Sequence, residues 1–156
     1  MTGTAEIKVL VVEDYEAMRM LIHRCLTRQG IANVRLKPSA DEALAALRGE
    51  RFDLIISDYQ LGGADGLELL KSVRDNPATR DTRFIMLTGS DDRELVREAM
   101  ALGADEYITK PFEPRSLRAV IERMFGADGE EAEDRGSRVF RSPRPVPAIG
   151  ADWLRA

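Results

Sequence analysis

The chain has 156 residues, 44% hydrophobic and 32% charged, a composition typical of one globular domain with some length to spare. Its formal net charge of −4 argues against a nucleic-acid-binding surface that covers the whole molecule. Cys25 is the only cysteine, so no internal disulfide can form. The N-terminus lacks the pattern of a signal peptide, and the apolar runs are far shorter than the roughly 18 residues of a membrane span. We therefore expect a cytoplasmic protein that binds neither nucleic acid nor a membrane.

Up to residue 126, short apolar runs alternate with longer segments of helical periodicity. The pattern predicts five strands, at residues 7–12, 33–37, 52–57, 84–87 and 106–109. A helix is predicted after each strand, with apolar positions within 18–26, 43–47, 67–73, 95–100 and 117–125. Ser39 and Glu42 form an S-x-x-E capping box at the start of the second helix. Asp65 can cap the third helix, and Pro114 suits the first turn of the last.

Five strand–helix units in succession predict an α/β fold, in which helices cover a parallel sheet on both faces. The third strand favours this arrangement. Leu54, Ile55 and Ile56 are consecutive apolar residues, without the polar alternation of a half-exposed strand. We therefore predict one domain over residues 1–126, built as a doubly wound (βα)5 sheet of five strands.

The composition changes after residue 126. An acidic block comes first, and it consists of Asp128, Glu130, Glu131, Glu133 and Asp134. Four arginines interleaved with prolines follow, and Trp153 lies near the end. Residues 127–156 are therefore predicted to be a flexible C-terminal tail. Two roles stay open: the tail docks on the domain and modulates it, or it is itself a partner-binding segment.

Polar side chains follow the predicted strands at the point where each strand ends. They are Glu13, Asp14, Asp58, Thr88 and Lys110. Because the carboxyl ends of parallel strands meet at one edge of a sheet, where open α/β sheets bind ligands, these side chains should lie together. Three carboxylates in one place repel one another unless a cation lies between them. A hard, oxygen-preferring ion suits them, and Mg²⁺ fits best.

Asp58 can serve as a metal ligand, as a nucleophile, or as both. Attack of its carboxylate on a phosphoryl donor gives an aspartyl-phosphate, a known form of covalent catalysis. Lys110 offers a positive charge and Thr88 a hydroxyl group to phosphoryl oxygens. Any one of these acids alone is more often a turn former or a helix cap, so the interpretation depends on the whole set.

Four motifs connect these residues to a known family. They are Val11-Val12-Glu13-Asp14; Ser57-Asp58 with Asp65-Gly66-Leu67; Leu87-Thr88-Gly89; and Gly103-Ala104-Asp105 through Lys110-Pro111-Phe112. Through these motifs, about four-fifths of the chain resembles the receiver domain of bacterial two-component response regulators. Among these it is most similar to the single-domain chemotaxis regulators. The resemblance implies a flavodoxin-like fold with strand order 2-1-3-4-5.

The resemblance also implies a role for each matched site residue. Asp58 would be the phospho-acceptor and, with Asp14 and the backbone carbonyl of Gln60, a ligand of Mg²⁺. Glu13 would act on the metal ion through a bound water. Lys110 would contact the phosphoryl group.

Two further residues would form a conformational switch. Thr88 would move to the phosphoryl group, and Tyr107 would then turn inward. The peptide bond before Pro111 would be cis, a form that X-Pro bonds adopt at little cost.

The chain departs from the family pattern at residues 61–63, where it has Leu-Gly-Gly and the family usually has Met-Pro. Glycine widens the conformational range of a loop, whereas proline narrows it. We therefore expect the loop that supplies the Gln60 carbonyl to be looser than in most relatives. The glycines fit neither common phosphate-binding motif, so we expect a simple turn there.

The resemblance implies a phosphorylation-dependent switch that is not an enzyme beyond its own phosphorylation and dephosphorylation. A sensor histidine kinase or a phosphotransfer protein would donate the phosphoryl group. The output would be binding of a target protein through the fourth helix, fifth strand and fifth helix, with the tail as a second candidate contact. Four arginines on these helices lie off the apolar stripes and favour an acidic or mixed-charge partner: Arg93, Arg97, Arg115 and Arg118.

Three other functions compete with this one. A phosphorelay intermediate, which passes the phosphoryl group onward, is hardly separable by sequence. A metal-dependent phosphatase typically has a second acid two residues after its nucleophile, where this chain has Gln60. A transcription regulator needs a DNA-binding domain, which the proline- and glycine-rich tail is too short to supply.

Overall fold

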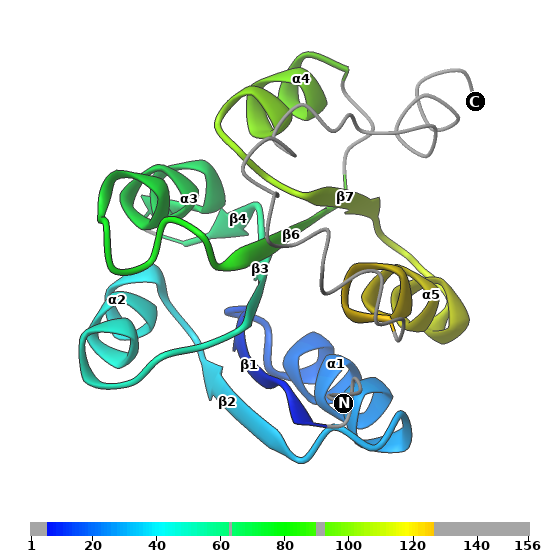
Figure 1. Cartoon of the computed structure of the whole chain (residues 1–156). Coiled ribbons are helices and arrows are strands. Elements are labelled where there is room, and N and C mark those ends of the chain that lie inside the picture. The colour runs from blue at the N-terminus through cyan, green and yellow to red at the C-terminus, as the bar shows by residue number, and fades with distance from the viewer. Residues whose placement is uncertain (1–5, 63, 90–92, 127–156) are drawn as a thin grey trace.

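The computed structural model describes residues 6–62, 64–89 and 93–126 of the chain (Figure 1). The predicted tail, residues 127–156, lies outside the described residues. Within the described part, no helix has the length and apolar character needed to cross a membrane.

The sheet has five parallel strands in the order β2-β1-β3-β6-β7. They are β1 (Lys8–Val12), β2 (Asn33–Lys37), β3 (Leu54–Asp58), β6 (Arg83–Thr88) and β7 (Glu106–Thr109). Because β6 and β7 are the fourth and fifth strands of this sheet along the chain, the expected order 2-1-3-4-5 is confirmed. The third strand begins later than predicted and includes Asp58 as its last residue.

Five helices cover the sheet. They are α1 (Glu16–Arg28), α2 (Ala40–Gly49), α3 (Gly66–Asp75), α4 (Arg93–Ala101) and α5 (Pro114–Phe125). α1 and α5 pack on one face of the sheet, and α2, α3 and α4 pack on the other (Figure 1). The predicted doubly wound α/β fold is therefore confirmed.

The central strand β3 contributes to an apolar core on each face of the sheet. Successive side chains of a strand point to opposite faces. Ile55 accordingly packs in the cluster beneath α2, α3 and α4, whereas Leu54 and Ile56 pack in the cluster beneath α1 and α5. All five residues of β3 are buried, which explains its continuous apolar sequence.

Side-chain caps mark the starts of α2 and α3. The Ser39 hydroxyl accepts a hydrogen bond of 3.1 Å from the backbone N–H of Glu42. The Asp65 carboxylate accepts one of 3.0 Å from the backbone N–H of Glu68. Both predicted caps are confirmed, and each satisfies an N–H group that has no partner within its own helix.

The loop after β3 has more structure than the predicted turn. It forms a short antiparallel pair, β4 (Gln60–Leu61) and β5 (Ala64–Asp65). Gly62 has φ +76°, a conformation that glycine adopts without steric cost. Strands of two residues leave no periodic pattern in a sequence, which is why this hairpin was not predicted.

Leu21 also differs from its prediction. It belongs to the predicted apolar face of α1, yet it is 37% exposed. Its side chain lines a groove between α1 and α5 instead of packing in the core.

Candidate functional site

The carboxyl edge of the sheet brings the predicted polar residues together. Asp58 and Thr88 are the last residues of β3 and β6, which lie side by side. Glu13 and Asp14 directly follow β1 on the other side of β3. Lys110 directly follows β7, the neighbour of β6.

Three carboxylates form a tight cluster at this edge. One carboxylate oxygen each from Glu13, Asp14 and Asp58 can be chosen so that all lie within 4.8 Å of one another. Glu13 and Asp58 are only 1% and 6% exposed, whereas Asp14 is open to solvent. The cluster is thus partly buried and accessible from one side.

Lys110 forms ion pairs with two of these three acids. Its Nζ lies 3.2 Å from Oδ1 of Asp58 and 3.4 Å from Oε1 of Glu13. The backbone N–H of Lys110 donates a 2.7 Å hydrogen bond to the carbonyl of Thr88, which ties the end of β7 to that of β6. The peptide bond between Lys110 and Pro111 is cis, as expected.

Burial and charge perturb Glu13 strongly. The pKa of its carboxyl is raised from 4.5 to about 7. Loss of solvation on burial is the main cause, and the neighbouring charge of Asp58 is the second. A hydrogen bond from the backbone N–H of Tyr15 and the charge of Lys110 act in the opposite direction without cancelling the shift. Burial therefore outweighs the contacts that stabilise the charged form of Glu13.

The donor set fits a hard divalent cation. Carboxylate oxygens are the protein ligands that Mg²⁺ prefers, and this ion usually binds through one or two carboxylates with water in its remaining positions. Asp14 and Asp58 can supply such ligands, and the solvent-accessible side leaves room for water. The excess of negative charge favours a cation of charge +2 over a second ammonium group.

The predicted switch residues lie on the other side of the phospho-acceptor candidate. Thr88 is 2% exposed and Tyr107 is 3% exposed. Tyr107 pairs in register with Met86 of β6 and belongs to the apolar cluster beneath α4. Gln60 lies in β4, two residues after Asp58, with an exposed side chain.

Gly66 is a site residue whose role the sequence did not reveal. A Cβ atom at this position would overlap the backbone carbonyl oxygen of Asp58 and would lie 3.0 Å from Sδ of Met86. α3 can therefore begin against Asp58 only because residue 66 has no side chain. Gly66 belongs to one of the family motifs, but a motif does not show which backbone atoms approach one another.

Comparison with known proteins agrees with this geometry. Residues 9–122 match the family model of the response regulator receiver domain. The chain is 35% identical over 127 residues to a probable chemotaxis protein CheY from Rhizobium etli, an alignment that covers 81% of the chain and 98% of the relative.

Two solved structures are also similar. The chemotaxis response regulator CheY4 of Vibrio cholerae has a TM-score of 0.70 and 34% identity, with 75% of this chain and 97% of that chain covered. The receiver domain of sensor histidine kinase PA1611 from Pseudomonas aeruginosa, with a magnesium ion in its active-site cleft, has a TM-score of 0.71 and 25% identity, with 81% and 100% covered. The fold, the acidic cluster and these relatives agree: the chain belongs to the response regulator receiver domain family, whose general function is that of a phosphoryl-accepting signalling switch.

Proposed function

We propose that this chain is a phosphorylation-dependent signalling switch with Asp58 as its phospho-acceptor. A carboxylate oxygen of Asp58 attacks the phosphorus atom of a phosphohistidine on a sensor kinase or a phosphotransfer protein. A P–O bond to Asp58 forms, the P–N bond to the donor breaks, and the donor imidazole leaves with the bonding electron pair. Water later hydrolyses the acyl phosphate and restores the carboxylate.

The position of Asp58 carries this proposal. Its carboxylate lies 3.2 Å from the Lys110 ammonium and within the cluster that Glu13 and Asp14 complete. Lys110 can contact an oxygen of the incoming phosphoryl group, and Thr88, at the end of the adjacent strand, can donate its hydroxyl to another. A buried aspartate that served only as a cap would not need two further acids beside it.

The acidic cluster supports Mg²⁺ as the required cation, with Asp14, Asp58 and the backbone carbonyl of Gln60 as ligands and Glu13 acting through water. Bound there, the ion would offset the negative charge of the phosphoryl group and the acids. Carboxylate oxygens of Glu13, Asp14 and Asp58, one from each, lie within 4.8 Å of one another, so these acids are already gathered before any donor arrives.

Phosphorylation would bias an equilibrium between two conformations. Attraction of Thr88 and Lys110 toward the phosphoryl oxygens would favour one state, with Tyr107 as the second member of the switch pair. The output would be binding of a target protein at the surface formed by α4, β7 and α5. Arg93 and Arg97 of α4 are exposed and can contact an acidic partner there.

The similarity to chemotaxis proteins extends the proposal to a role in motility. The proposed domain organisation is a receiver domain over residues 1–126 followed by a tail over 127–156.

The decisive experiment is phosphorylation of the purified chain by acetyl phosphate with and without Mg²⁺. We expect a hydroxylamine-labile acyl phosphate that needs Mg²⁺ and is absent in Asp58→Asn. Asp53→Asn is the matched control, because Asp53 precedes the same strand at its opposite end, where its carboxylate accepts a hydrogen bond from the Lys8 backbone. Labelling that persists in Asp58→Asn would disprove the assignment, and rapid turnover of varied phosphate esters would favour a phosphatase.

A further inference from the structure

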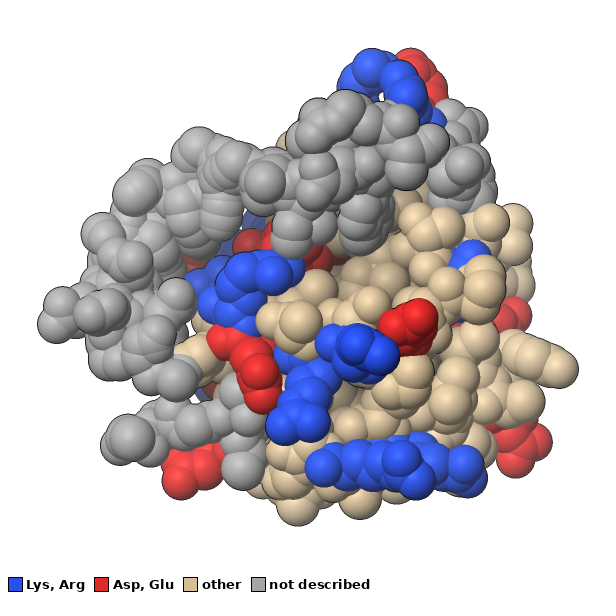
Figure 2. All heavy atoms as spheres, turned by 90° about the vertical axis from the view of Figure 1, so that its right-hand side faces the viewer, with Lys and Arg blue, Asp and Glu red and all other residues tan. Residues whose placement is uncertain are grey.

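A groove between α1 and α5 carries a concentration of positive charge, and two of its arginines, Arg115 and Arg118, belong to the set predicted to favour an acidic partner. It has a volume of about 430 Å³ and is lined by eight residues: Leu21, Arg24, Cys25, Arg28, Gln29, Pro114, Arg115 and Arg118. Four of the eight are arginines, and none is acidic. Figure 2 views the side of the molecule on which α5 lies in Figure 1, and blue Lys and Arg side chains gather across its described part.

The arginines lie at spacings that bring like charges together. Arg24 and Arg28 are four residues apart on α1, and Arg115 and Arg118 are three apart on α5. Such pairs are neighbours on a helix surface and repel each other. A bound group with several negative charges would relieve this repulsion on both helices at once.

The described carboxylates near the groove offset this charge only in part. Arg115 and Arg118 form exposed ion pairs with Glu113 and Glu122 of their own helix region, at 3.3 and 3.2 Å. Exposed pairs of this kind are weak. Arg24 and Arg28 form no ion pair with a residue that the structure describes.

The groove is also lined by residues without charge. Leu21 is exposed at 37% and Cys25 is half-buried, so the groove offers apolar contact beside its guanidinium groups. The side-chain amide nitrogen Nε2 of Gln29 is buried and has no hydrogen-bond partner among the described residues. The Gln29 side chain would have to turn toward the groove for a carboxylate or a backbone carbonyl of a docked segment to accept that hydrogen bond.

We propose that the acidic block of the tail, residues 128–134, docks in this groove and covers it. The block has five acids within seven residues, Asp128, Glu130, Glu131, Glu133 and Asp134, and it begins two residues after Gly126. Its five negative charges are opposite in sign to the four arginines of the groove and exceed them by one. The arginines that follow from residue 135 onward would be repelled, which confines docking to the acidic block.

The length of the connection permits this docking. Arg118 lies eight residues before Gly126, a distance of about 12 Å along α5 at about 1.5 Å per residue. An extended chain covers about 3.3 Å per residue, so Glu130 reaches about 13 Å from Gly126 and Asp134 about 26 Å. The block can thus turn back along α5 and reach both pairs of arginines. Any anionic partner of the groove then has to displace it.

Cys25, the only cysteine of the chain, provides a native probe inside the groove. The full chain is treated with N-ethylmaleimide, an uncharged thiol reagent, at low ionic strength. We compare it with a variant of neutral acidic block, D128N/E130Q/E131Q/E133Q/D134N. If the docked state holds about four-fifths of the population, the thiol of the variant reacts about fivefold faster.

The matched control neutralises the basic part of the same tail, R135Q/R138Q/R141Q/R144Q, and should leave Cys25 protected. High salt should accelerate the reaction of the unaltered chain and remove its difference from the acidic-block variant. Because burial raises the pKa of the Cys25 thiol while Arg24 and Arg28 lower it, rates are compared per thiolate from full pH–rate profiles.

Exchanging the charges of the groove and of the acidic block provides an independent test of docking. The variant R24E/R28E should lose protection of Cys25, and replacing the five tail acids by lysine in that background should restore it. Equal thiolate reactivity of the unaltered chain and the acidic-block variant at low salt would overturn the proposal. Protection that rises with protein concentration would also overturn it, because it would assign the groove to a second copy of the chain.

Discussion

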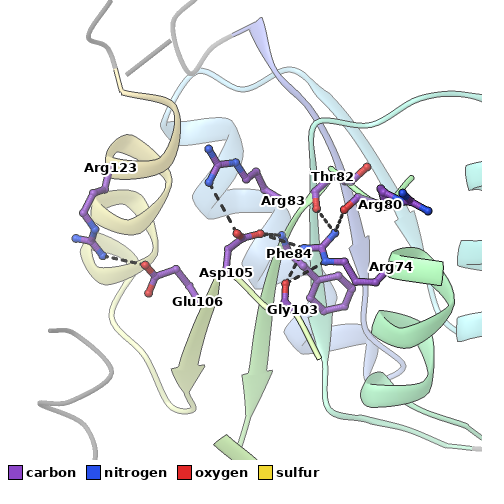
Figure 3. A network of polar contacts seen from close by, with 9 residues as sticks. All are labelled: Arg74, Arg80, Thr82, Arg83, Phe84, Gly103, Asp105, Glu106 and Arg123. Atoms are coloured by element: carbon purple, nitrogen blue, oxygen red, sulfur yellow. Dashed lines mark hydrogen bonds and ion pairs between the residues drawn. The ribbon is translucent and has the colours of Figure 1, made fainter. Parts of the chain in front are cut away.

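The sheet ends in a cluster of charged side chains at both of its edges, and the two clusters are balanced differently. At the carboxyl edge, three carboxylates meet one ammonium group, that of Lys110. At the amino edge, where β6 and β7 begin, Asp105 lies between the guanidinium groups of Arg74 and Arg83 (Figure 3). Both clusters are partly buried, so their charges are costly unless they are compensated.

At the amino edge, the hydrogen-bonding groups of Arg74 and Asp105 find their partners within the chain. The Arg74 guanidinium donates to the backbone carbonyls of Gly103, Arg80 and Thr82 at 2.6–3.1 Å and to the Asp105 carboxylate at 3.2 Å. Asp105 also accepts a 2.9 Å hydrogen bond from the backbone N–H of Phe84. Burial lowers the pKa of Arg74 and the charge of Asp105 opposes that effect.

The difference separates a structural role from a functional one. Arg74 and Asp105 join the end of α3, the start of β6 and the turn before β7 with groups from the chain alone. The carboxyl edge keeps an excess of negative charge that only an added cation can balance. A polar cluster that completes itself stabilises the fold, whereas an incomplete one costs stability and indicates a ligand.

The largest expected effect is on stability and comes from the amino edge. Asp105→Ala leaves Arg74 buried without its carboxylate and removes the acceptor of the Phe84 N–H. Breaking a buried ion pair from one side costs about 3–5 kcal/mol. Urea unfolding of the metal-free protein should show this loss. Phosphorylation of the fraction that remains folded should be unchanged.

The control for this variant is Asp75→Ala. Asp75 forms an exposed ion pair with Lys71, at 3.5 Å, one residue after Arg74. Its removal should change the free energy of unfolding by about 0.5 kcal/mol or less. Equal losses from Asp75→Ala and Asp105→Ala would contradict the structural role of the network.

The second prediction concerns pH and the carboxyl edge. The folded protein raises the pKa of Glu13 to about 7, whereas an unperturbed glutamate has about 4.5. The folded state thus holds this proton more tightly, and the resulting stability is complete below pH 4.5 and lost as the pH rises through 7. The free energy of unfolding of the metal-free protein should fall over that range by up to about 3 kcal/mol relative to Glu13→Gln.

The measurement is a series of urea titrations between pH 4.5 and 8 in the presence of a chelator. Other acids titrate in both proteins, so the difference between the two curves reports Glu13 together with its interaction with Asp58. A constant difference over the whole range would mean that Glu13 keeps an ordinary pKa in the fold.

The third prediction uses one glycine at each edge. Gly66→Ala places a methyl group against the Asp58 carbonyl, and overpacking of this kind costs about 1–3 kcal/mol. Gly103→Ala forces a φ of +109° on alanine and brings its Cβ to 2.8 Å from Nε of Arg74. Both should lower stability, but only Gly66→Ala should also slow phosphorylation by acetyl phosphate. Gly49→Ala, with open space around it, is the neutral control.

The two edges also differ in how far the sequence could predict them. Glu13, Asp14, Asp58, Thr88 and Lys110 each follow an apolar run, so strand recognition alone places them at one edge, and the structure brings them together there. The roles of Gln60 and Tyr107 depended on the family resemblance and stay predictions. Neither the strand-end positions nor the roles read from the family resemblance required knowledge of long-range packing.

The amino-edge network could not be predicted in this way. Arg74 and Asp105 are 31 residues apart, and three of the four acceptors of Arg74 are backbone carbonyls, which every residue has. The exposure of Leu21 has a similar origin, since periodicity cannot tell a core contact from a groove between two helices. Packing between elements decides both, and it leaves no local pattern in the sequence.

The smallest expected change in the free energy of unfolding concerns Asp58 at the carboxyl edge, and it is compared with that of Asp105 at the amino edge. Asp58→Asn should stabilise the metal-free protein by about 1 kcal/mol at pH 8, the opposite sign to Asp105→Ala. The substitution removes a buried charge and its repulsion from Glu13 and Asp14, which together outweigh the lost ion pair with Lys110.

In the presence of Mg²⁺, Asp58→Asn should instead be less stable than the unaltered protein. An ion that binds only the folded state stabilises it in proportion to the logarithm of its concentration over Kd, and Asp58→Asn loses a proposed ligand. Urea titrations in a chelator and in saturating Mg²⁺ therefore test both signs. A destabilised Asp58→Asn protein in the chelator would mean that Lys110 alone balances the acids. The carboxyl edge would then be as complete as the amino edge.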